Sequence, residues 1–97
     1  MDINQIRLEL SEKVKTIPPI GKKLKFKLDG DFILIDGSSE TNELRNADEE
    51  ADCTITMSIE TYQKLQQKKI NPMIATLTGK VKVKGDIGTA QKLKQLM

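Results

Sequence analysis

The stretch from Asn71 to Met97 reads NPMIATLTGKVKVKGDIGTAQKLKQLM, and it contains in succession the patterns of a helix, a strand and a second helix. Asn71 and Pro72 are typical of a helix start, because the Asn side chain accepts from free N–H groups and proline suits the first helical position. Gly79 is expected to end this short helix. Its apolar residues Met73, Ile74 and Leu77 share one face.

The strand pattern that follows alternates valine with lysine over residues 80–84. In a strand this alternation sends the valines to one face of the sheet and the lysines to the other. Asp86 suits the N-cap of a last helix, whose apolar stripe is expected to lie over the valine face. As the last element, this helix is expected to be the movable wall of any cavity beneath it. The stripe consists of Ile87, Ala90, Leu93, and Leu96 or Met97.

Two earlier segments alternate in the same way. Residues 53–57 alternate apolar with hydroxyl side chains, and Ser58 suits the start of the next helix. Residues 23–28 alternate lysine with apolar residues, and Asp29-Gly30 predicts a tight turn into the apolar run 32–35. Four large apolar residues in a row indicate an interior strand that is partly covered on both faces. The lysines expected to project from the face opposite the helices are Lys23, Lys25, Lys27, Lys80, Lys82 and Lys84.

The remaining segments complete an α+β pattern. Apolar residues spaced by three and four predict an amphipathic helix over residues 2–15, which Pro18 and Pro19 end. Residues 40–52 carry six acids and predict a short edge strand followed by a solvated loop. The expected fold is therefore a five-stranded, largely antiparallel (mixed) sheet with helices packed on one face.

Two of these segments resemble a known family. Residues 78–88, TGKVKVKGDIG, and residues 51–57, ADCTITM, resemble the corresponding segments of the sterol carrier protein 2 family of lipid-transfer domains, and the likeness extends from about Ile20 onward. The resemblance implies the same sheet, with an apolar tunnel between sheet and helices that holds a lipid. Eukaryotic members often end in a peroxisomal Ser-Lys-Leu type signal, whereas this sequence ends in QLM, so peroxisomal targeting is not expected.

The residues alone leave open whether the apolar positions form a packed core or line a tunnel. The resemblance favours the tunnel. The expected lipid-binding residues are Ile33, Ile35, Ile55, Met57, Met73, Leu77, Val81, Val83, Ile87, Ala90, Leu93, Leu96 and Met97.

Length and composition bound the class of protein. Ninety-seven residues, of which 37% are hydrophobic and 31% charged, suggest one globular domain over residues 1–97. The sequence shows neither a signal peptide nor an apolar run long enough to span a bilayer, and a single cysteine suits a reducing compartment, so a cytoplasmic location is expected. The net charge of +2 divides into +4 over residues 1–28, −9 over 29–60 and +7 over 61–97.

Catalytic chemistry finds little support in the sequence. Histidine, the commonest general base, is absent, and Cys53 shares a strand face with apolar residues, which indicates a buried structural thiol. The acids at 48–50 and 52 lack the spacing of a calcium loop and suggest a solvated loop. The glycines at 79, 85 and 88 match no phosphate-binding loop, and Gly88, inside a first helical turn, suggests a close approach by another element or a ligand. We expect no enzyme activity, no metal and no cofactor.

Three functions remain as hypotheses. The first is non-enzymatic binding and transfer of fatty acid, fatty acyl-CoA or sterol in an apolar cavity. The second is an accessory module of the same fold with a closed cavity, acting through protein–protein contacts. The third, nucleic-acid binding, rests only on the lysines and is the weakest, because the sequence has only three aromatic residues to stack on bases. The sheet-face lysines could instead contact anionic membranes, or they could simply keep a sheet edge from pairing.

Overall fold

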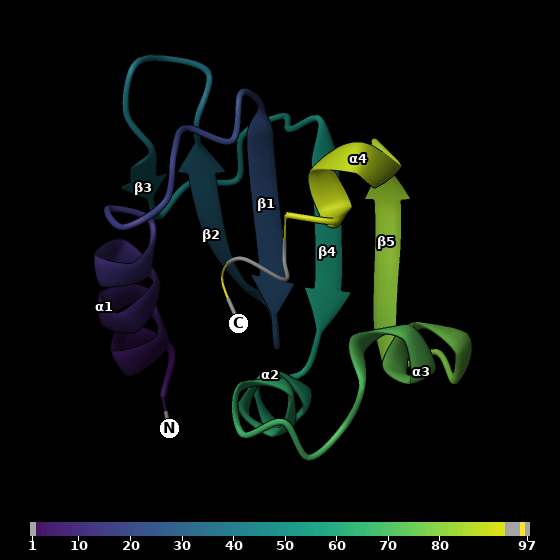
Figure 1. The fold of residues 1–97 in the computed structure, drawn as a ribbon. Coiled ribbons are helices and arrows are strands. Elements are labelled where there is room, and N and C mark those ends of the chain that lie inside the picture. The colour runs from purple at the N-terminus through teal and green to yellow at the C-terminus, as the bar shows by residue number, and fades with distance from the viewer. Residues whose placement is uncertain (1, 93–95, 97) are drawn as a thin grey trace.

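The computed structural model describes residues 2–92 and Leu96. The helices and strands follow the predicted order (Figure 1). They are α1 Ile3–Lys13, β1 Lys23–Leu28, β2 Asp31–Asp36, β3 Glu43–Arg45, β4 Cys53–Met57, α2 Ile59–Gln66, α3 Pro72–Leu77, β5 Val81–Gly85 and α4 Ile87–Ala90.

The five strands form one mixed sheet in the order β3-β2-β1-β4-β5. Three neighbouring pairs are antiparallel, and β1 pairs with β4 in parallel. Asp29 and Gly30 both have positive φ values, 48° and 89°, as a two-residue hairpin turn requires, so the predicted β1–β2 hairpin is confirmed. This strand order makes β3 and β5 the two edges of the sheet.

The core lies between the sheet and α1, α2 and α4. Strand β1 contributes three buried residues to this core, Leu24, Phe26 and Leu28. Each pairs in parallel register with a buried apolar residue of β4. On the near side of Figure 1, α1 lies beside β2 and β3, and α4 crosses β4 and β5. Helix α3 lies at the start of β5 and contacts that strand.

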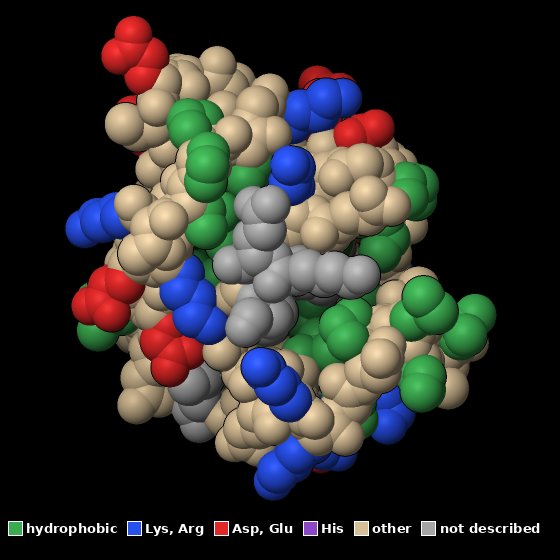
Figure 2. All heavy atoms as spheres, in the orientation of Figure 1, with side chains coloured by type: hydrophobic (Ala, Val, Ile, Leu, Met, Phe, Trp, Pro, Cys, Tyr) green, Lys and Arg blue, Asp and Glu red, His purple; other side chains and the backbone are tan. Residues whose placement is uncertain are grey.

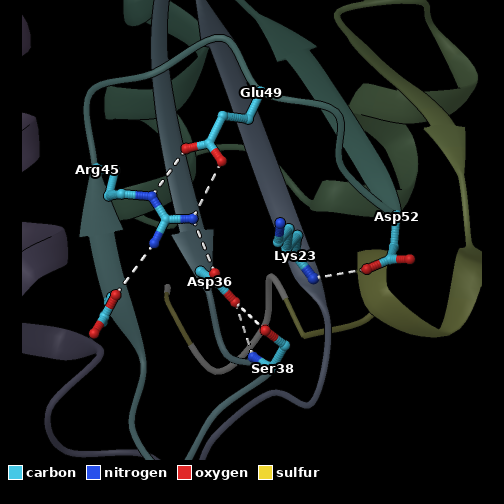
Figure 3. Close-up of polar contacts among 7 residues, drawn as sticks. Lys23, Asp36, Ser38, Arg45, Glu49 and Asp52 are labelled. Carbon is cyan, nitrogen blue, oxygen red and sulfur yellow. Dashed lines mark hydrogen bonds and ion pairs between the residues drawn. The ribbon is translucent and has the colours of Figure 1, made fainter.

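The loop after β3 leaves Asn46, Asp48 and Glu50 exposed, as the predicted solvated loop would, but it is also held against the sheet. The Arg45 side chain donates to the carboxylates of both Asp36 and Glu49 at 2.9 Å (Figure 3). Lys25 Nζ donates to Asp48 at 2.7 Å. These contacts hold the acidic loop against the lysine face of β1 and β2. Leu34, which points to this face, is fully buried, so β2 is covered on both faces as its apolar run predicted.

The predicted lysine face exists, but its lysines do not form one continuous patch. The side chains of β1 and β5 that face away from the core are five of the six predicted lysines, and the sixth, Lys80, directly precedes β5. Strand β4 lies between β1 and β5 and places Thr54 and Thr56 on this face, so the two lysine rows are about 10 Å apart.

The last helix corrects two expectations. Ile87 was expected to face the sheet but is 62% exposed, whereas Thr89 is buried. The reason is the cap: Asp86 accepts from both the N–H and the hydroxyl of Thr89, which turns Thr89 towards the protein. Gly88 was expected to mark a close approach, but among the described residues a side chain there would meet only the Asp86 carboxylate, at 3.4 Å.

Candidate lipid-binding groove

An apolar groove of about 370 Å³ lies where α3, the β4–β5 edge of the sheet and α4 meet. Eight of its ten lining residues are apolar, and its volume lies within the range of small-molecule sites. The tunnel implied by the family resemblance is not seen among the described residues, which form an open groove instead. The lining residues are Ile55, Pro72, Met73, Thr76, Leu77, Val81, Val83, Ile87, Ala90 and Gln91.

Seven of the thirteen expected lipid-binding residues meet in this groove. They are Ile55, Met73, Leu77, Val81, Val83, Ile87 and Ala90. Four others, Ile33, Ile35, Met57 and Leu96, are buried in the core and do not line the groove. The last two, Leu93 and Met97, lie outside the described residues.

Local capping positions the walls of the groove. Asn71 accepts from the Met73 N–H at 2.8 Å, and Gly79, with a φ of 80°, ends α3 in a left-handed turn. The N–H of Lys80 then donates to the Ala75 carbonyl at 2.9 Å, which closes the turn and leads the chain directly into β5. Ala75 packs against the core, and Met73 and Leu77 project beside the valines of β5.

Sequence reasoning missed three lining residues: Pro72, Thr76 and Gln91. Thr76 lies three positions after Met73, and therefore on the same face of α3, so helical spacing could have identified it. Gln91 follows Ala90 at the end of α4. Thr76 and Gln91 are the two polar side chains of the groove.

The reactive side chains of the chain are held in unreactive states. Burial raises the pKa of the Cys53 thiol, and the nearby Asp86 carboxylate adds to the shift, so Cys53 stays protonated. Burial also raises the pKa of Tyr62 to about 12, and its hydroxyl accepts from Gln66. The described residues hold no cluster of three or more acids or thiols with which to bind a metal ion.

A second hollow, of about 610 Å³, lies between the end of α2 and the start of α3. It is larger than the groove but less suited to an apolar ligand, because lysine and asparagine side chains form much of its wall. The hollow and the groove share Pro72 and Met73. The hollow is lined by Leu65, Lys68, Lys69, Ile70, Asn71, Pro72 and Met73.

Comparison with known proteins shows which family has this architecture. The family model described as the SCP-2 sterol transfer family matches residues 3–97. The chain belongs to this family. The resemblance carried by residues 51–57 and 78–88 is thereby confirmed.

Individual members of the SCP-2 sterol transfer family show how far the likeness extends. Sterol carrier protein 2 of Homo sapiens is 45% identical over 53 residues, which is 55% of this chain and 10% of that protein, so the chain spans about a tenth of the curated relatives that it matches. A sterol carrier protein domain of Helicoverpa armigera is 30% identical, with a TM-score of 0.64 over 90% of this chain and 69% of that one. Palmitated SCP2L2 from Aedes aegypti is 19% identical and has a TM-score of 0.75 over 99% of this chain and 94% of that one, which shows the shared fold.

Proposed function

We propose that this chain binds a lipid in the groove between α3, β5 and α4 and transfers it between membranes without catalysing a reaction. The supporting observation is the groove itself, because an apolar cleft of ligand size lies exposed at an edge of the sheet in a member of a sterol transfer family. Fatty acid, fatty acyl-CoA and sterol are the ligand classes that we consider, and residues 1–97 would act as a single domain.

The energy of such binding would come mainly from burial of apolar surface. Each buried methylene contributes about 0.8 kcal/mol, so a long acyl chain needs few polar contacts to bind. Thr76 and Gln91 are placed to hydrogen-bond a polar group of the ligand. A structure of a relative that is named palmitated gives an acyl chain as the first ligand to test.

Native mass spectrometry of the purified chain tests this proposal, together with displacement of a fluorescent fatty acid. Ala90 lines the groove, so Ala90→Leu should fill part of it and weaken fatty-acid binding by about tenfold, with little loss of stability. Ala47→Leu, in the acidic loop, is the matched control and should bind as the wild type does.

Two results would contradict the proposal. A bare protein mass without any displacement of the fluorescent fatty acid would favour the accessory module with a closed cavity. Destabilisation of Ala90→Leu by about 1–3 kcal/mol without an effect on ligand would show that Ala90 is packed rather than facing an open groove.

A further inference from the structure

Helix α3 exposes large hydrophobic side chains in three of its six positions. Met73 is 70% exposed, Ile74 59% and Leu77 80%, whereas Ala75 is the buried residue of the helix. Figure 2 shows hydrophobic side chains gathered on the surface of the molecule over α3, at the lower right. Contiguous exposed apolar side chains on a surface mark an interaction site.

The groove accounts for only part of this exposure. Met73 and Leu77 line the groove, but Ile74 does not. Together the three side chains reach beyond the groove, so a ligand inside it would leave Ile74 in water.

The charge around α3 identifies the kind of partner. Residues 61–85 contain six lysines and no Asp or Glu. Lys68 and Lys69 precede α3, Lys80 follows it, and all three are exposed. Within the described part of the chain, none of these three lysines takes part in an ion pair.

We propose that α3, with Lys68, Lys69 and Lys80 beside it, is the surface that docks on an anionic phospholipid bilayer. Its hydrophobic side chains would enter the interface while the lysines contact lipid phosphates, as in other amphipathic interfacial elements. This inference deepens the proposed transfer function and rests on it, because docking here brings the mouth of the groove to the bilayer. The hollow lined by Lys68 and Lys69 shares Pro72 and Met73 with the groove, so these lysines lie next to the groove.

Two other surfaces fit a membrane less well. On the sheet face, Lys25 is paired with Asp48, and threonines separate the lysine rows. On α1, Leu8 is 62% exposed, but Glu9 and Glu12 on the same helix would meet anionic headgroups unfavourably. Both surfaces lack the combination of several exposed large apolar side chains with flanking lysines that make no ion pair within the described residues.

The test compares binding to phosphatidylcholine vesicles with and without phosphatidylserine. Ile74→Asp should weaken binding to the anionic vesicles by about tenfold or more, because it removes an inserting side chain and adds a negative charge. Leu8→Asp is the matched control, since Leu8 is about as exposed as Ile74, and it should bind as the wild type does.

The lysines are tested separately. Lys68→Gly and Lys69→Gln should each weaken binding to anionic vesicles by about fivefold, whereas Lys15→Gln, an exposed lysine beyond α1, should have no such effect. Lys68 has a positive φ of 58°, so glycine suits its backbone and weaker binding by that variant would not reflect poorer folding.

The outcomes separate this inference from the proposed function. Fatty-acid displacement is measured without vesicles, and Ile74→Asp should leave it unchanged because Ile74 does not line the groove. If the wild type binds anionic vesicles through α3 but no fatty acid, the proposed ligand is wrong and the docking surface stands. Equal vesicle binding by Ile74→Asp and wild type would overturn the docking surface. An equal loss of vesicle binding by Leu8→Asp and Ile74→Asp would also overturn it. The same holds if the wild type forms a dimer that only Ile74→Asp dissociates, while its vesicle binding stays unchanged.

Discussion

At the scale of single residues, Asp36 joins β2 to the acidic loop. The pKa of Asp36 is lowered to about 2 (Figure 3). Hydrogen bonds from the hydroxyl and the N–H of Ser38 are the largest causes, and the hydrogen bond from Arg45 is the next. A carboxyl group whose pKa is lower in the folded state stabilises the protein above its unfolded pKa and loses this contribution as the pH falls through its folded pKa. The contribution of Asp36 is therefore complete at pH 7 and declines between about pH 4 and pH 2.

We expect Asp36→Asn to lower the free energy of unfolding by about 1 kcal/mol at pH 7, with a smaller difference from wild type at pH 2. The modest value reflects the partial exposure of Arg45. Urea unfolding at both pH values measures the difference, and Asp31→Asn, at the exposed start of the same strand, is the control. An equal loss at both pH values would show that the ionised carboxylate is not the stabilising group.

Lys68 carries backbone strain at the end of α2. Its N–H donates to the Leu65 carbonyl and that of Lys69 to the Lys64 carbonyl, which is the usual hydrogen-bond pattern of a glycine-terminated helix. Lys68→Gly should therefore raise the free energy of unfolding by about 0.5–1 kcal/mol, because a side chain in the left-handed region is strained. Thermal unfolding measures this change, and Lys68→Ala, which keeps the strain, should not show the gain.

At the scale of elements, α3 and α4 form two walls of the groove and rest on the edge strand β5. Their described parts are short, six and four residues, and short helices depend on packing for their stability. A ligand between them would supply packing that the free protein lacks.

Saturating fatty acid should therefore raise the melting temperature and slow hydrogen exchange in α3 and at residues 89–92. Helix α1 lies by the opposite edge of the sheet, beside β3, so its exchange should slow by less than exchange in α3 and at residues 89–92. Hydrogen exchange followed by mass spectrometry separates the two regions. Uniform protection of all helices would indicate that the ligand stabilises the fold as a whole and does not bind in the groove.

At the scale of the whole molecule, the strand order separates the charges. The acidic segment 40–50 lies at the β3 edge, and the lysine-rich segment 61–85 lies at the opposite edge with β5 and α3. The resulting asymmetry would orient the protein with α3 towards an anionic surface before contact.

Association with anionic vesicles should therefore slow by about tenfold or more as salt is raised, because salt screens long-range attraction. Stopped-flow fluorescence with labelled vesicles measures the rate, and neutral vesicles, for which little salt dependence is expected, are the control. A rate that salt does not change would mean that docking depends on hydrophobic contact alone.

Among the described residues, no helix is both long and apolar enough to cross a bilayer.

The sequence by itself determined the elements and the direction of their side chains. Alternation in residues 23–28, 53–57 and 81–84 depends only on the geometry of an extended chain, and caps such as Asn71 and Asp86 act within one helical turn. These local rules were sufficient for the order of elements, the hairpin at Asp29 and the lysine face. The segments around Cys53 and Val81 also carried the family resemblance.

Only the tertiary structure decided which apolar residues meet. Ile33 and Val83 look alike in sequence, but Ile33 lies in the interior strand β2 and is fully buried in the core, whereas Val83 lies in the edge strand beside the groove. Exposure of Ile74 could not be predicted either, because its helical pattern is that of a packed face. Burial depends on contacts between elements distant in sequence, so an apolar residue in a core and one in an open groove have the same local pattern.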